Sequence, residues 1–258
     1  MNKRYSLRTL ALLLALCLAF PARPAGAGDE LAFVSERALQ CGVHSETVDR
    51  VHAAVDSGEI DGAHGADLLL PLVEACGLEL PLAPFEDKLE EGLSKHVRPQ
   101  VIAHALQEKV EDYVFVRNLL PEPREKVDIL ALEALAEGVS KGVPREDVEA
   151  YAAEFGGVSV QRRIPFLVGA EMVSLLGQVR FDYDLTRTML EAGFASDSLT
   201  PEWNYLIRLV LLARERGIKD KHVASHAVIV LSDRGSLGDL YARLGITGRS
   251  LTGGAGSD

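Results

Sequence analysis

The sequence predicts an all-α protein, an irregular stack of antiparallel αα-hairpins with about 11 to 12 helices. Apolar residues recur at intervals of three and four between glycine and proline punctuation, and alternating runs rich in Val, Ile, Thr and Tyr are scarce. In addition, one helix-turn-helix pattern occurs four times. The chain has 258 residues, of which 47% are hydrophobic and 25% charged, and this excludes a collagen-like, low-complexity or wholly disordered chain.

Proline and glycine set the expected helix limits. We expect helices at residues 30–41, 45–57, 63–76, 84–95, 99–119, 123–141, 144–155, 161–179, 183–192, 200–216, 219–233 and 236–244. Ser45, Asp182 and Thr200 are candidate N-caps, because short polar side chains accept hydrogen bonds from the first free amides. Six glycines are candidate C-terminal stops: Gly42, Gly58, Gly77, Gly142, Gly193 and Gly217. Pro71 cannot donate the intrahelical bond and should kink or split its helix.

The repeated pattern centres on a turn residue that follows each of four helices. The turn residues are Gly42, His96, Gly142 and Gly217, and they are followed by Val43, Val97, Val143 and Ile218. The residue four before the turn is always small, and the residue six after it is always Val or Ile. We expect the small residue to let the branched side chain fold back over the finished helix. The intervals between turn residues are 54, 46 and 75, so the stack lacks the fixed period of tetratricopeptide or ankyrin repeats.

The first 27 residues have the features of an export signal. Three basic residues precede an apolar core from Leu10 to Phe20, and Ala25-Gly26-Ala27 is a cleavage sequence. We therefore expect residues 1–27 to be a signal peptide and the mature protein to be exported, to the periplasm or the extracellular space. The alternative is a lipoprotein anchored through Cys17. The sequence argues against it, since Leu16 stands where lipoprotein signals have a small residue.

Cleavage after Ala27 would leave a strongly acidic protein. It would remove four basic and no acidic residues, so that 23 Lys and Arg would remain against 38 Asp and Glu, a net charge of −15. Such a chain is repelled by phosphate backbones and anionic lipid. We therefore expect no nucleic-acid partner.

The mature chain is expected to divide near residue 120. We expect an N-terminal helical-hairpin region at 28–120, a second helical region packed on it at 121–246, and a disordered tail at 247–258. The most apolar mature stretch, 164–177, is hydrophobic on all sides, which predicts the core of the second region. Its 14 residues are too few to cross a bilayer, so no integral membrane segment is expected after cleavage.

Two cysteines, Cys41 and Cys76, remain in the mature chain, each followed by a glycine. If a helix ends at each of these cysteines, and one antiparallel helix lies between the two helices, the two helix ends emerge on the same side of the stack. An oxidising compartment then allows a disulfide between them. Two buried free thiols are the alternative.

The sequence contains weak candidates for chemistry. Glu171 lies in the middle of the apolar helix 161–179, where an unpaired carboxyl group would titrate high as a general acid does, whereas a paired one would be structural. His222 and His226 lie one helical turn apart, so both imidazoles could reach one metal ion, but a third ligand is missing. We expect ordinary histidines here and no cofactor. Serine-nucleophile and phosphate-binding motifs are absent from the sequence.

These features predict an exported interaction or scaffold protein without a catalytic motif, whose partner is another protein or a peptide. The alternatives are an enzyme built around Glu171 or the two histidines, and a carrier of a hydrophobic ligand. A cleft with an unpaired, solvent-facing Glu171 would favour the enzyme. A closed apolar cavity beside residues 161–179 would favour the carrier, and a packed core with an exposed groove would favour the scaffold.

Overall fold

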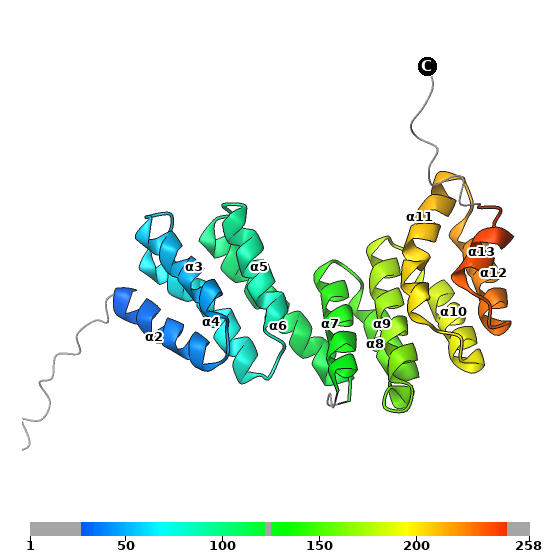
Figure 1. Ribbon diagram of the computed structural model, residues 1–258, viewed down its shortest axis with the longest axis horizontal. Helices are drawn as coiled ribbons and strands as arrows, with labels where there is room; N and C mark the ends of the chain where they lie inside the picture. The colour runs from blue at the N-terminus through cyan, green and yellow to red at the C-terminus, as the bar shows by residue number, and fades with distance from the viewer. Residues whose placement is uncertain (1–26, 122–124, 247–258) are drawn as a thin grey trace, which may run out of the picture.

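The computed structural model describes residues 27–121 and 125–246, and within these ranges it contains twelve α-helices, two 3-10 helices and no strand (Figure 1). The first six α-helices are α2 (Ala27–Gln40), α3 (Ser45–Asp56), α4 (Gly62–Gly77), α5 (Ala83–Ser94), α6 (Pro99–Leu119) and α7 (Lys126–Ser140). The next elements are α8 (Arg145–Phe155), η1 (Gly156–Val158), α9 (Arg163–Gln178) and α10 (Tyr183–Ser196). The last are η2 (Pro201–Tyr205), α11 (Leu206–Glu215), α12 (Asp220–Ser232) and α13 (Leu237–Arg243). Sequential helices pack antiparallel, so the predicted all-α class is confirmed.

The helices form two rows of an elongated array that runs from α2 at one end to α13 at the other (Figure 1). In the first row α2, α4, α6, α7 and α9 pack against one another in that order, and η2 continues the row beyond α9. In the second row α3 packs against α5, and α10 packs against α12. Phe155 of α8 stacks on Phe194 of α10, with ring centroids 4.8 Å apart. One hydrophobic core cluster extends from Leu31 to Ile246 between the rows.

The four predicted turns all have the same capped geometry. Their turn residues are left-handed, with φ of 91° at Gly42, 50° at His96, 92° at Gly142 and 73° at Gly217. At each turn the next residue donates its backbone N–H to the carbonyl of the small residue four before the turn, as Val43 does to Ala38 over 3.1 Å. This is the six-to-one bond of a Schellman cap. The small residue also has a packing role, because a Cβ added to Gly92 would lie 2.7 Å from Ile102 of α6.

The same cap occurs at six further corners that the pattern did not identify. Their left-handed residues are Gly58, Glu79, Arg180, Asp197, Arg234 and Gly245. In each case the N–H of the following residue again bonds to the carbonyl four residues before the turn residue. The left-handed conformation strains a residue that has a Cβ, by about 1–2 kcal/mol. The backbone bond of the cap offsets part of that strain at the helix end.

Several details of the sequence prediction are wrong. Val97 is 37% exposed, whereas Val43 and Val143 are 3% exposed, so Val97 does not clamp its helix as they do. The expected stop Gly193 lies inside α10, which ends before the left-handed Asp197. A Cβ at Gly193 would lie 2.6 Å from Leu199, so close packing rather than a turn accounts for this glycine.

Three further expectations concern helix starts and prolines. Ser45 is the first residue of α3 rather than its N-cap, which is His44. The predicted helix 200–216 begins as the 3-10 helix η2 and continues as α11. Pro71 lies inside α4, which continues through it to Gly77. Asp182 is confirmed as an N-cap, since its carboxylate accepts from the amides of Asp184 and Leu185.

Cys41 and Cys76 form a disulfide, with their Cα atoms 5.8 Å apart. Cys41 follows the last residue of α2, and Cys76 lies in the last turn of α4. The bond therefore joins two neighbouring helices of the first row at the same end, as the antiparallel arrangement predicts.

Several sequence predictions fall outside the described residues. These are the signal peptide 1–27 apart from its last residue, the candidate lipid-bearing Cys17, and the tail 247–258. Among the helices that are described, none combines the length and the apolar character that a bilayer span requires.

Candidate functional site

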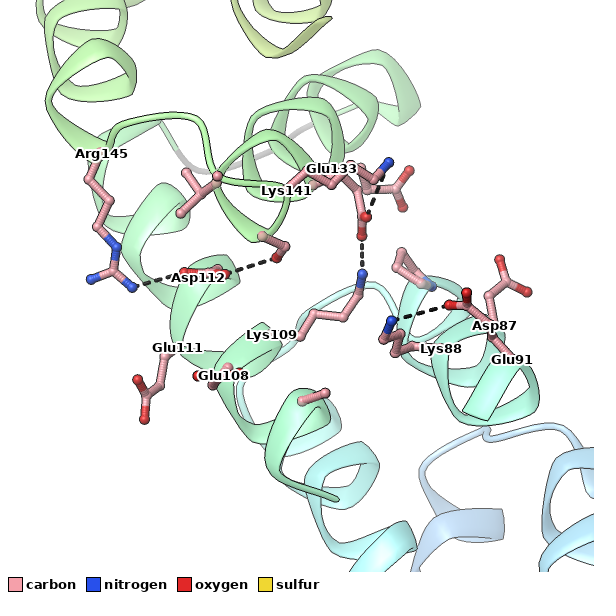
Figure 2. Close-up of a pocket in the computed structure, with 16 residues that line it drawn as sticks. Asp87, Lys88, Glu91, Glu108, Lys109, Glu111, Asp112, Glu133, Lys141 and Arg145 are labelled. Atoms are coloured by element: carbon pink, nitrogen blue, oxygen red, sulfur yellow. Dashed lines mark hydrogen bonds and ion pairs between the residues drawn. The ribbon is translucent and has the colours of Figure 1, made fainter. Parts of the chain in front are cut away.

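A groove lies where the second row of helices is interrupted. Helices α6 and α7 follow each other within the first row, so among the described elements no second-row helix lies between α5 and α8. The groove has a volume of about 770 Å³ and is lined by α5, α6, α7 and the α7–α8 corner (Figure 2). Its lining contains seven carboxylates and four cationic side chains, a formal charge of −3.

A buried ion pair joins two walls of this groove. Lys109 of α6 is only 7% exposed and donates to Glu137 of α7, which also accepts a hydrogen bond from the Tyr113 hydroxyl at 2.9 Å. The ammonium lies 6.0 Å from the ring centre of Phe85 and 5.5 Å from that of Tyr113, within reach of a cation–π attraction. Burial, with the negative charge of Glu137, raises the pKa of Tyr113 well above its usual range, so the phenol remains a donor.

The remaining cations of the groove are also paired. Arg145 Nη2 lies 2.8 Å from Asp112, whose other oxygen accepts from the Ser140 hydroxyl at 2.9 Å. Lys88 lies 3.2 Å from Glu91, and Lys141 lies 3.9 Å from Glu137. Hydrogen bonds from Lys95 and Lys88 lower the pKa of Glu91 to about 2. These cations are therefore engaged with carboxylates of the protein itself.

Four carboxylates of the groove have no Lys or Arg within ion-pair distance among the described residues: Asp87, Glu108, Glu111 and Glu133. Glu108 has a histidine neighbour, His104, at 3.4 Å. Burial, followed by the repulsion of Glu137, raises the pKa of Glu133. The groove therefore holds negative charge that its own cations do not neutralise, and a cation placed there would be attracted.

The structure places Glu171 away from this groove. Its carboxylate is half-buried in α9 and accepts a hydrogen bond from the side-chain amide of Asn204 in η2. Burial raises the pKa of Glu171, and the bond from Asn204 opposes that rise. Because this carboxylate has a partner and lines neither described groove, its surroundings are those of a structural group.

A second, smaller groove lies at the C-terminal end of the array, between α11 and α13. Its volume is about 430 Å³, and its lining is Tyr205, Arg208, Leu211, Leu212, Glu215, Leu237 and Tyr241. The guanidinium of Arg208 lies 5.0 Å from the centre of the Tyr205 ring. Most of the remaining lining is apolar, so this groove differs in character from the charged one.

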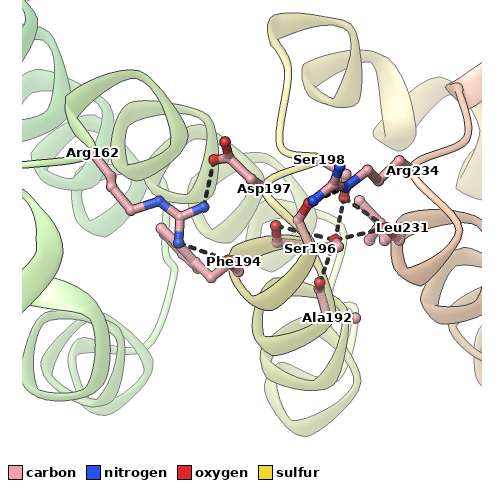
Figure 3. Close-up of polar contacts among 9 residues, drawn as sticks. Arg162, Ala192, Phe194, Ser196, Asp197, Ser198, Leu231 and Arg234 are labelled. Atoms are coloured by element: carbon pink, nitrogen blue, oxygen red, sulfur yellow. Dashed lines mark hydrogen bonds and ion pairs between the residues drawn. The ribbon is translucent and has the colours of Figure 1, made fainter.

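The polar contacts around the end of α10 serve the fold (Figure 3). Arg162 donates to the carbonyl of Phe194 at 2.6 Å and to Asp197 at 2.5 Å. Arg234 donates to the carbonyl of Ser196 at 2.8 Å. The hydroxyls of Ser196 and Ser198 both donate to the carbonyl of Leu231 at 2.8 Å, which joins α10 to α12. These groups satisfy carbonyls that the helix ends leave unbonded.

Sequence reasoning missed the groove residues, although one signal was present. Lys109 occupies a position on the apolar stripe of α6, in register with Leu106 and Tyr113. A charged residue on such a stripe must be paired when buried, so it indicates a buried ion pair.

In the comparisons with known proteins, no protein-family model, no curated protein and no solved structure matches this chain.

Proposed function

We propose that this protein is an exported helical-array module that binds a basic segment of a partner protein in the groove between α5 and α8. The observation that carries the proposal is the charge balance of that groove. All four cations of its lining are paired internally, whereas four of its carboxylates have no Lys or Arg partner among the described residues. A lysine or arginine side chain from a partner would supply the missing counter-charge.

The position of Glu133 supports a cationic ligand. Its raised pKa reflects the cost of keeping a partly buried carboxylate ionised near Glu137. A bound ammonium or guanidinium lowers that cost, because it favours the ionised form of the carboxylate. The groove is lined by three helices, α5, α6 and α7, and a face made by several helices suits a peptide segment.

The other two hypotheses have less support. Glu171 is engaged with Asn204, so it lacks the unpaired, solvent-facing carboxylate that an enzyme built around it would need. The groove at α11 and α13 is apolar and favours the carrier as a second candidate, but it is open and small. A carrier would enclose most of its ligand.

The test uses a fluorescently labelled hexalysine peptide and the full chain, with binding measured by fluorescence polarisation at low ionic strength. Glu111→Gln combined with Glu133→Gln should weaken binding roughly tenfold, because two unpaired carboxylates are lost from the groove. Added salt should weaken wild-type binding, since exposed charges are screened. Labelled hexaglutamate should not bind.

A matched control separates the groove from the net charge of the protein. Asp49→Asn combined with Asp67→Asn removes the same two charges at exposed positions on α3 and α4, outside the groove. This control should bind hexalysine as wild type does. Equal weakening of both double variants would show that the peptide follows the overall charge, and the proposed groove would then be wrong.

A further inference from the structure

The two histidines of α12 are brought together by the fold. The Nε2 atoms of His222 and His226 lie 3.2 Å apart, and the ring planes are inclined at 73°. His222 is exposed and His226 is half-buried. The rigid part of this arrangement is the helix itself, which places residues four apart on one face.

The separation of the two nitrogens fits a shared transition-metal ion. Imidazole nitrogens bind zinc at about 2.0–2.1 Å. Two such bonds to nitrogens 3.2 Å apart enclose an angle of roughly 100° at the metal, between the square-planar and tetrahedral values. The spacing of the two nitrogens therefore suits one ion bound by both rings, in place of the hydrogen bond that joins them.

The surroundings determine what kind of site this would be. Among the described residues no third His, Cys, Asp or Glu joins the pair, so water or an external ligand must fill the other positions. Asp220, at the start of the same helix, is engaged with Arg214 at 2.6 Å. The Nδ1 atom of His226 is buried without a hydrogen-bond partner. Metal-binding histidines usually donate from that second nitrogen, and its absence weakens affinity by about 10- to 100-fold.

We propose that His222 and His226 form an open, two-histidine site for a divalent transition-metal ion on the outer face of α12. The site is independent of the groove between α5 and α8. Imidazole ligands suit copper, nickel and zinc, and the general order of stability places Cu²⁺ above Zn²⁺. The ion would retain exchangeable positions, so the site would bind reversibly and leave room for a ligand from solution.

The experiment titrates the tag-free full chain with Cu²⁺ against a chromophoric chelator and records the electron paramagnetic resonance spectrum of the bound ion. Wild type should bind one equivalent with two nitrogen ligands from this pair. His222→Ala and His226→Ala should each weaken that binding by roughly tenfold or more. The double variant should lose much less than the sum of the two single losses, because either single substitution already removes the chelate and leaves one imidazole.

His104→Ala is the matched control, since His104 is an exposed histidine on α6 without a histidine neighbour one turn away. It should bind Cu²⁺ as wild type does. Thermal unfolding gives a second readout, because an ion bound only by the native pair raises the melting temperature of wild type and not of His222→Ala. Equal Cu²⁺ affinity in wild type and both single variants, or additive losses in the double variant, would overturn the proposal.

Discussion

The two halves of the array are connected by different means. In the N-terminal half, from α2 to α7, a disulfide between Cys41 and Cys76 joins α2 to α4, and the buried pair of Lys109 with Glu137 joins α6 to α7. In the C-terminal half, from α8 to α13, the connections include side chains that donate to helix-end carbonyls, as with Arg162, and also with Arg214, whose Nη1 lies 2.8 Å from the carbonyl of Val179. The first half depends on a few strong links, and the second on many modest ones.

This difference explains where carboxylates without a Lys or Arg partner occur. In the C-terminal half several polar side chains bond to backbone carbonyls, and those of Ser196 and Ser198 join α10 to α12. In the groove between α5 and α8, acids and bases pair with one another, and more acids than bases are present. The interruption of the second row leaves the excess carboxylates facing solvent. We therefore expect substitutions in the first half to reduce the free energy of unfolding more than substitutions in the second half.

The largest loss is expected from the disulfide. Replacing Cys41 and Cys76 together by serine should reduce the free energy of unfolding by roughly 3–4 kcal/mol, because the bond closes a loop of 35 residues in the unfolded chain. Urea denaturation of the oxidised proteins measures this change. Reduction of wild type should produce the same loss, and a loss below about 1 kcal/mol in both experiments would contradict the expectation.

The buried ion pair is expected to come next. Lys109→Met leaves Glu137 without its closest cation and should reduce the free energy of unfolding by about 2–3 kcal/mol. The value is set below that of a fully buried pair, since the Glu137 side chain is 28% exposed. Combining Lys109→Met with Glu137→Leu should restore much of the stability. Urea denaturation measures all three variants. A reduction in the double variant equal to the sum of the two single reductions would contradict this account.

A smaller loss is expected in the C-terminal half. Arg162→Met keeps much of the packing on Phe194 but removes the bonds to its carbonyl and to Asp197. The expected reduction is about 1 kcal/mol, because Asp197 is exposed and the remaining contact is one hydrogen bond to a carbonyl. A reduction as large as that of Lys109→Met, measured in thermal or urea unfolding, would show that the two halves do not differ as described.

The sequence predicted the helices well because their limits are encoded locally. The four corners marked by Gly42, His96, Gly142 and Gly217 could be found from a glycine or histidine followed by a branched residue. The corners at Glu79, Arg180 and Arg234 could not, since Glu and Arg ordinarily avoid the left-handed region. There the helix end and its backbone bonds decide the conformation, and the side chain carries no signal.

The candidate site was less predictable for a different reason. Lys109 could be identified as unusual from its place on an apolar stripe, but its partner Glu137 lies 28 residues later on another helix. The groove itself depends on α6 and α7 sharing one row, which follows from packing rather than from periodicity. The spacing of His222 and His226, in contrast, is a property of a single helix and could be predicted directly.

The smallest expected effect is a pH dependence in the first half. Glu86 of α5 is 7% exposed and accepts from the backbone N–H of His44 at 2.9 Å and from its ring Nδ1 at 2.5 Å. The hydrogen bond and the charge of Glu86 raise the pKa of His44 above 6.5. The unfolded chain lacks this partner, so the contribution is fully present below pH 6.5 and is lost as the pH rises through the higher folded pKa. The melting temperature of wild type should therefore fall relative to that of His44→Gln between pH 6 and pH 8, whereas His104→Gln should follow wild type. If His44→Gln and wild type kept a constant difference over this range, the pair of His44 with Glu86 would make no pH-dependent contribution to stability.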